Sequence, residues 1–385
     1  MSAVDSISMW MRAEQLPLAR AVLSAVKLNC ALVGSPEAGR AVALASALGG
    51  KPADDLRAAL ASSGQQSGIF LLLDTGELLR NDRAGPDAEA LRVRRARHAP
   101  IISIEPLPAS LAELRSSTNA MQTQPPGPPV ALDGTPDSGF ALTTPVIAPR
   151  VTADIVTPAA LGRLCRPLAD LGSLMTEFGP ARSASIMSTG CGLDGSLGAR
   201  LFDAMDLACS LFGEAEFVDA GYGNPSGHRG LSNGPFAAQA AHGLRRLTGD
   251  LACVLRWTGG RTATIFVSDA AGPLTRRVMI LGPSGLIEAS DHTLTWRDSS
   301  GTIIKHPSRA DHAPASVPFD VAAESLSRLI SELAAAGTDG GSNQPEAAPE
   351  ITVDYPATLA MCEAALLSVR TGQPESPALL RHAAR

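Results

Sequence analysis

The sequence predicts an α/β protein with two domains, and two observations predict this class. In the first part of the chain, short apolar runs alternate with helical stretches, and strands that are apolar throughout are typical of a buried parallel sheet. From residue 216 to residue 306 the pattern changes to period-2 strands separated by tight turns, which is typical of an antiparallel sheet. The first pattern is that of an abbreviated Rossmann domain, and the second is that of an α/β domain with a mostly antiparallel sheet.

The first domain is predicted over residues 27–115, after an N-terminal helical extension over residues 1–26. Apolar runs predict parallel strands at 28–33, 68–73 and 100–104. Helices are expected at 8–26, 37–48, 52–62, 87–97 and from 110 to 115. Helices 37–48 and 52–62 follow each other with no apolar run between them. The strand that carries the ribose-binding acid of a nucleotide-binding domain is therefore predicted to be missing.

The second domain is predicted over residues 151–375, after a proline-rich linker over 116–150. It begins with a helix at 157–172, a strand near 184–187, a glycine-rich loop at 190–198 and a strong helix at 197–212. A Thr-Gly-Gly turn joins strands 251–257 and 261–268 into a hairpin. Further strands are expected at 278–281, 286–289, 292–296 and 302–306. Helices at 319–336 and 355–371 flank a flexible insert at 337–350.

Composition excludes several classes of function. The net charge is −6 with both signs interspersed, so nucleic acid is not expected as a partner. No apolar run approaches the ~20 residues that span a bilayer, so no membrane partner is expected either. The six cysteines form no Cys-x-x-Cys pair, and the histidines lack metal-ligand spacing, so no metal site is predicted. We expect a cytoplasmic protein, because no basic segment followed by an apolar run opens the chain.

A glycine-bounded turn follows the strand at 28–33. A dinucleotide-binding fold has Gly-x-Gly-x-x-Gly in such a turn, where the glycines allow the backbone to approach pyrophosphate. Here a proline replaces the middle glycine and a glutamate adds negative charge, so a plain strand-to-helix turn is the alternative interpretation. Asp54 and Asp55 lie at the sequence distance of a ribose-binding acid, but capping of helix 52–62 is the favoured role. The residues assigned to cofactor binding in this turn are Gly34, Ser35, Pro36, Glu37, Ala38 and Gly39.

Four stretches carry a resemblance to a known family. Residues 102–113 (ISIEPLPASLAE) look like a strand, a Glu-Lys-Pro signature and its following helix. Residues 201–214 (LFDAMDLACSLFGE) look like a helix with an Asp-x-x-x-His motif that ends in a Leu-Phe-Gly-Glu corner. Residues 258–266 match a hairpin of the substrate domain, and residues 364–372 match a final helix. In this order the chain resembles the glucose–fructose oxidoreductase / inositol dehydrogenase (Gfo/Idh/MocA-like) family over most of its length.

The resemblance implies a Rossmann domain joined to a domain with a large, open-faced sheet. It implies binding of NAD or NADP and oxidation or reduction of a sugar-like or cyclitol substrate. The open face of the sheet often mediates dimers or tetramers in the family, so a homo-oligomer is expected. In the family, the lysine of Glu-Lys-Pro and the histidine of Asp-x-x-x-His work near the carbon that exchanges hydride.

The resemblance assigns site residues by position. Glu105 stands for the lysine of the signature, and Pro106 stands for its proline. Counting back from Gly213, Asp203 falls at the histidine position, and Asp206 matches a frequent acid of the family. Two carboxylates cannot supply the positive charge of a lysine, and two nearby carboxylates repel each other unless they share a proton. Either Glu105 and Asp203 converge as an acid/base pair or a metal site, or both positions drifted after catalysis was lost.

Asp74, Thr75 and Asp194 complete the predicted site. Asp74 and Thr75 follow strand 68–73 and, with Pro106, are assigned to cofactor binding. Asp194, the charged residue of the glycine-rich loop, is assigned to the substrate together with Asp206, although four glycines more often indicate a mobile loop. Two hypotheses follow from this set of residues. The first is an NAD(P)-dependent oxidoreductase with Glu105 and Asp203 in place of the usual lysine and histidine, and the second is an inactive relative that serves as a structural or regulatory binding or oligomerisation module.

Overall fold

The computed structural model describes residues 6–63, 68–75, 100–115, 156–158, 161–223, 243–245, 247–309, 320–336 and 353–383. Several predicted segments lie outside these residues. They are the helix at 87–97, the linker at 116–150 and the insert at 337–350.

The first sheet contains six parallel strands in the order β3-β2-β1-β4-β5-β6. This is the 3-2-1-4-5-6 order of the Rossmann fold, so the predicted fold class is confirmed. The central strands β1 and β4 are buried along their whole length. The strands are β1 (Ser6–Trp10), β2 (Asn29–Gly34), β3 (Lys51–Ala53), β4 (Gly68–Leu72), β5 (Ile101–Ser103) and β6 (Val156–Pro158). Their connections contain η1 (Ala13–Gln15), α1 (Leu16–Val26), α2 (Ala41–Leu48) and α3 (Leu56–Ser63).

The beginning of the chain differs from the prediction. The helix expected at 8–26 does not begin there, because Ser6–Trp10 form β1, which pairs with β2 on one side and β4 on the other. The helical pattern begins only at Leu16. Short β3 lies between α2 and α3 and pairs with β2, so the strand predicted to be missing is present. The sheet therefore begins one strand earlier in the sequence than the apolar runs indicate.

The second sheet contains eight strands in the order β14-β13-β12-β11-β7-β10-β9-β8. Every neighbouring pair is antiparallel except β7 and β10, as the mostly antiparallel prediction requires. The strands are β7 (Ser183–Cys191), β8 (Phe217–Gly223), β9 (Asp250–Arg256), β10 (Thr262–Ser268), β11 (Ala270–Gly282), β12 (Gly285–Ser290), β13 (Thr293–Arg297) and β14 (Ile303–Arg309).

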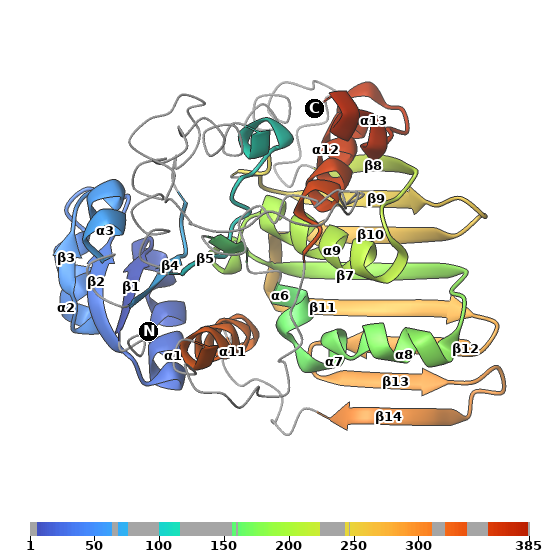
Figure 1. The fold of residues 1–385 in the computed structure, drawn as a ribbon, viewed down its shortest axis with the longest axis horizontal. Helices are drawn as coiled ribbons and strands as arrows, with labels where there is room; N and C mark the ends of the chain where they lie inside the picture. The colour runs from blue at the N-terminus through green and yellow to red at the C-terminus, as the bar shows by residue number, and fades with distance from the viewer. Residues whose placement is uncertain are drawn as a thin grey trace, which may run out of the picture.

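Helices cover one face of this sheet. In Figure 1, α8, α9 and α12 lie across the same face, and their apolar side chains share one core with the inward rows of the strands. The opposite face carries exposed apolar side chains, among them Val254, Phe266 and Met279. The helices of this part are α6 (Leu161–Leu164), α7 (Arg166–Ala169), α8 (Leu171–Phe178), η2 (Gly192–Asp194), α9 (Leu197–Phe212), α12 (Tyr355–Thr371) and α13 (Pro377–Ala383).

One late helix belongs to the first sheet. Helix α11 (Asp320–Ala336) lies beside α1 in Figure 1, and Leu326 and Ile330 share a core with Ile7 and Leu18. The sequence boundaries expected for the two domains placed this helix in the second domain. In space, the first unit also includes β6 and α11 from later in the chain.

Candidate functional site

The candidate site lies at the carboxyl ends of the parallel strands. In an open α/β sheet, ligands bind where the strand order reverses, which in this sheet is between β1 and β4. Three segments meet this edge: Met11–Gln15 after β1, Asp74 and Thr75 after β4, and Glu105 after β5. On the other side stands the start of α9, the helix that the resemblance marks as catalytic.

The turn after β1 contains no glycine. Its backbone donors are bonded to the protein's own side chains: the N–H of Ala13 donates to Glu37 Oε2 at 3.2 Å, and the N–H of Arg12 donates to Gln15 Oε1 at 3.0 Å. Backbone N–H groups at the first turn of such a helix are the ones that hold a pyrophosphate in dinucleotide-binding folds. Here a carboxylate and a carboxamide accept these hydrogen bonds instead.

The side chains of this turn close it further. The Arg12 guanidinium is paired with the Asp74 carboxylate, which is buried at the end of β4. The Trp10 indole lies against the Cα of Gly34, because a Cβ built on Gly34 would overlap the ring. Thr75 is buried beside Asp74. An ion pair therefore lies at the reversal point, and an indole ring lies beside it between β1 and β2.

The predicted phosphate-binding turn does not lie at the point where the strand order reverses. The turn Gly34–Gly39 follows β2, not the strand at the reversal point, because β1 precedes it in the sequence. Ser35 is buried and its hydroxyl accepts from the N–H of Glu37, while Gly39 adopts φ +74° before α2. Asp55 accepts a hydrogen bond from the N–H of Arg57 at 2.8 Å at the start of α3, which confirms its capping role. Pro36 and Ala38 lie exposed in the same turn.

Glu105 is bound to the start of α9. Its Oε1 accepts from the backbone N–H of Ser196 at 2.8 Å, and its Oε2 accepts from the Ser196 hydroxyl at 2.6 Å. A carboxylate at a helix N-terminus is stabilised by the helix dipole. Burial nevertheless raises the pKa of Glu105, against the lowering effect of the two Ser196 hydrogen bonds. At the position of the family's lysine, this chain has a half-buried carboxylate bonded to the start of a helix, and Pro106 is buried next to it.

Asp203 faces a different set of partners. Its Oδ1 accepts from the N–H of Gly162 at 2.7 Å, and its Oδ2 lies 3.5 Å from Arg276 Nη1. Glu105 and Asp203 therefore do not form a pair, since each is bonded to its own partner. Among the residues that the structure describes, no three His, Cys, Asp or Glu side chains are grouped to hold a metal.

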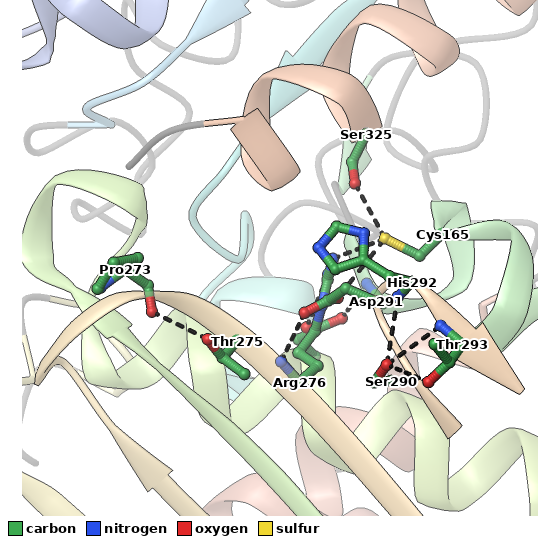
Figure 2. Close-up of polar contacts among 11 residues, drawn as sticks. Cys165, Pro273, Thr275, Arg276, Ser290, Asp291, His292, Thr293 and Ser325 are labelled. Atoms are coloured by element: carbon green, nitrogen blue, oxygen red, sulfur yellow. Dashed lines mark hydrogen bonds and ion pairs between the residues drawn. The ribbon is translucent and has the colours of Figure 1, made fainter. Parts of the chain in front are cut away.

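Arg276 is the centre of a buried polar cluster (Figure 2). Its Nε donates to Asp291 Oδ1 at 2.6 Å, its backbone N–H donates to Asp291 Oδ2 at 2.7 Å, and Nη2 contacts Cys165 Sγ at 2.8 Å. Cys165 also lies 3.4 Å from the Ser325 hydroxyl of α11. Burial alone lowers the pKa of Arg276, but Asp291, Cys165 and Asp203 raise it above its usual value, so the guanidinium stays charged. Burial raises the pKa of the Cys165 thiol to about 11, which makes it a poor nucleophile.

The two carboxylates assigned to the substrate are also buried. Asp206 forms an ion pair with Arg163 of α6. Asp194 accepts from the Cys191 thiol at 3.3 Å and lies 4.0 Å from Arg200, and burial raises its pKa. None of the predicted acids therefore presents an uncommitted carboxylate at an exposed surface.

Sequence reasoning missed Gln15, Arg200 and Arg276. Arg276 had a signal: it occupies the inward row of β11, where Val278 and Ile280 are buried, and a charge in such a row requires buried partners. Arg200 is fully buried against Gly190, where a Cβ would lie 2.8 Å from Nη2. Gln15 had no signal, because its partners come from segments far away in the sequence.

The chain was compared with known proteins. No protein-family model and no curated protein sequence matches it. An oxidoreductase from Agrobacterium radiobacter, solved in complex with NAD+, L-tartaric acid and magnesium, is similar in structure with a TM-score of 0.61 at 16% identity, over 97% of this chain and 99% of that chain. A putative myo-inositol dehydrogenase from Sinorhizobium meliloti has a TM-score of 0.58 at 15% identity, over 96% and 99%. A myo-inositol dehydrogenase from Corynebacterium glutamicum has a TM-score of 0.59 at 13% identity, over 97% and 98%.

These likenesses show the fold alone: the chain shares the α/β architecture of these solved structures. Some of the similar structures hold NAD or NADP. In this chain, the first turn of the helix after β1 does not fit a pyrophosphate, because Glu37 places a carboxylate at the N–H of Ala13. Two anions at one helix terminus would repel each other.

No helix among the described residues is long and apolar enough to cross a membrane.

Proposed function

We propose that this protein is a non-catalytic relative of nicotinamide-dependent oxidoreductases that serves as a binding and oligomerisation module. One observation carries the proposal: the Glu37 carboxylate accepts a hydrogen bond from the Ala13 N–H, where a dinucleotide would place its phosphates. The Arg12–Asp74 ion pair occupies the adjoining edge of the sheet.

The residues at the family's catalytic positions support the same proposal. General acid/base catalysis needs a group within hydrogen-bond reach of the substrate proton. Glu105 is engaged by Ser196, and Asp203 is engaged by Gly162 and Arg276. Neither can supply the positive charge that stabilises an alkoxide during hydride transfer. The side chains of Glu105 and Asp203 therefore bind other segments of the protein.

Titration calorimetry with NAD+, NADH, NADP+ and NADPH tests the proposal on the purified full chain. We expect no saturable heat for any of the four at millimolar concentration. Saturable binding of any of the four nucleotides would refute it.

The second candidate is an active NAD(P)-dependent oxidoreductase of a sugar-like substrate. The similar structures favour it, since an oxidoreductase with the same architecture binds NAD+. Turnover of a polyol or aldose, followed by the absorbance of the reduced nicotinamide, is the test of this candidate. Activity that disappears in Glu105→Ala and persists in Glu324→Ala, at an exposed position of α11, would support it over the first.

The partner that we propose is a second copy of this chain, bound through the outer face of the eight-stranded sheet. Phe266, Met279 and Leu281 are each more than 40% exposed on this face. Large apolar side chains exposed on one sheet face are typical of protein–protein contacts, and a face that meets its own copy gives a closed dimer. Light scattering after size exclusion should show a dimer or tetramer, and Phe266→Arg should convert it to a smaller species. A monomeric wild-type protein would contradict this part of the proposal.

A further inference from the structure

Strand β11 contains a bulge near its beginning. Its pairing with β7 is irregular there, so residues 271–274 lie opposite Gly190 alone. A bulge of this kind bends the strand and redirects its side chains. Gly272 adopts φ +88° in the bulge, a conformation that favours glycine. The residues of the bulge before Leu274 are exposed, whereas Leu274 is only 4% exposed.

The Leu274 side chain belongs to the apolar core of the first domain. It shares that core with Ile104, which follows β5, and with Leu326 of α11. It does not belong to the core that α9 and α12 form on the second sheet. Among the residues that the structure describes, Leu274 is the one strand residue of the second sheet in the first core. Strand β11 thus supplies a side chain to the core of the other domain.

A polar contact two residues further along β11 reaches the same domain. Figure 2 shows Arg276 beside Cys165, with 2.8 Å between Nη2 and Sγ, and Cys165 lies 3.4 Å from the hydroxyl of Ser325 in α11. The Cys165 side chain also packs against both apolar cores. Leu274 and Arg276 together form what we call the β11 clamp. It connects the second sheet to the first domain, directly through Leu274 and by way of Cys165 from Arg276.

We infer that the β11 clamp couples the two domains, so that they unfold as one cooperative unit. Domains of one chain often meet through small polar interfaces, and multidomain proteins often unfold in separate steps. Here a leucine of one domain is buried in the core of the other, so loss of either domain exposes that leucine or leaves a cavity around it. The inference goes beyond the proposed function and does not depend on nucleotide binding.

Urea unfolding followed separately in the two domains tests the coupling. Pulsed hydrogen exchange of the full-length protein reports on β4 for the first domain and on β10 for the second at each urea concentration. In the wild type we expect coincident midpoints, because coincident probes are the sign of one cooperative transition. In Leu274→Ala we expect the β4 midpoint to fall about 0.5 M or more below the β10 midpoint, because the cavity lies in the core of the first domain.

Leu18→Ala is the matched control. Leu18 of α1 is fully buried in the same core, but it belongs to the first domain itself. Its loss should lower the β4 and β10 midpoints together, since the intact clamp passes the loss on to the second domain. In the double variant Leu18→Ala/Leu274→Ala, the β4 midpoint should fall further, while the β10 midpoint stays where Leu274→Ala placed it.

Two results would overturn the inference. The first is separate midpoints for β4 and β10 in the wild type, which would mean that the domains unfold independently despite the clamp. The second is coincident midpoints in Leu274→Ala, which would make Leu274 a core residue like any other. If Leu274→Ala does not fold, Leu274→Val carries the same test with a smaller separation in the same order. The nucleotide titration is a separate measurement, so either proposal can fail while the other stands.

Discussion

Asp206 of α9 forms an ion pair with Arg163 of α6, with 2.8 Å between Oδ2 and Nε. One helical turn earlier, Asp203 accepts from the N–H of Gly162 in the same short helix. Two acids at positions i and i+3 share one face of a helix, and here that face binds α6. The acids that the resemblance placed in a catalytic site thus attach the segment that joins the two sheets.

The Asp206 pair predicts a pH dependence of stability. Burial raises the pKa of Asp206 from 3.8 to about 7, although Arg163 lowers it. Between about pH 4 and pH 7 the folded protein keeps a proton that the unfolded chain has released, so the free energy of unfolding falls as pH rises through this window. The stability of the wild type relative to Asp206→Asn should therefore decrease from about pH 5 to about pH 8. Urea unfolding at several pH values measures it.

Asp298, in the turn between β13 and β14, serves as a control because it should have the opposite pH dependence of stability. The side-chain hydrogen bond from Ser300 lowers the pKa of the exposed Asp298. Its carboxylate stabilises the folded state only when ionised, so the stability of the wild type relative to Asp298→Asn should rise as the pH increases from acid. If the difference in the free energy of unfolding between the wild type and Asp206→Asn does not change with pH, the raised pKa of Asp206 is contradicted.

Removal of the Glu37 carboxylate should destabilise the protein. In Glu37→Ala the Ala13 N–H loses its acceptor, and loss of a helix cap costs about 1 kcal/mol. Glu14→Ala, at an exposed position of the same turn, should change the free energy of unfolding by less than about 0.5 kcal/mol. The denaturant midpoints of the two variants give the comparison. Equal midpoints would mean that the Glu37 carboxylate does not stabilise the turn that begins at Ala13.

Two helical glycines should respond oppositely to alanine. A Cβ on Gly198 of α9 would overlap the carbonyl oxygen of Leu244, whereas a Cβ on Gly172 of α8 would meet nothing within 4 Å. We expect Gly198→Ala to lose about 3 kcal/mol or to prevent folding, because the backbone of Leu244 cannot move away easily. Gly172→Ala should gain about 0.5–1 kcal/mol from the lower flexibility of the unfolded chain. Thermal unfolding distinguishes the two, and a stable Gly198→Ala protein would mean that α9 and Leu244 are less closely packed.

The Arg276 cluster should be sensitive to loss of its cation. In Arg276→Met the buried carboxylate of Asp291 loses its partner, and breaking a buried pair in this way costs about 3–5 kcal/mol. The matched control is Arg297→Met, because Arg297 pairs with Glu288 at 3.6 Å where both side chains are more than 40% exposed. That change should cost less than about 1 kcal/mol. Similar losses in both variants would argue against a buried ionic cluster.

Much of the secondary structure was predictable from local patterns. The helix Leu197–Phe212 was predicted with its correct ends, because Ser196 is a good N-cap residue and Gly213 ends the apolar stripe. The hairpin of β9 and β10 followed from period-2 alternation on both sides of a Thr-Gly-Gly turn. Both signals are local, so one sequence suffices to read them.

The first strand was missed although it had a signal. Ser6 to Met9 alternate small polar and large apolar side chains, yet both rows are buried, because β1 lies between β2 and β4 with a core on each face. The helical periodicity of the following residues masked this alternation. The error then moved the phosphate turn by one strand, since the position of a turn in a Rossmann sheet depends on counting strands from the first.

The candidate site was only partly predictable. Its residues Glu105 and Asp203 were found by position, but their partners were not. Ser196 lies 91 residues from Glu105, and Arg276 lies 73 residues from Asp203. The first pair is created where the two domains meet and the second where α9 packs on β11, and no spacing in the sequence reports either.

Helix α11 covers α1 although some three hundred residues separate them in the sequence. A fragment that ends before residue 320 would leave the apolar side chains of Leu18 and Val22 facing water. During synthesis, the core of the first domain therefore cannot be completed until α11, near the end of the chain, has been made. Until then, its earliest strands depend on protection from aggregation.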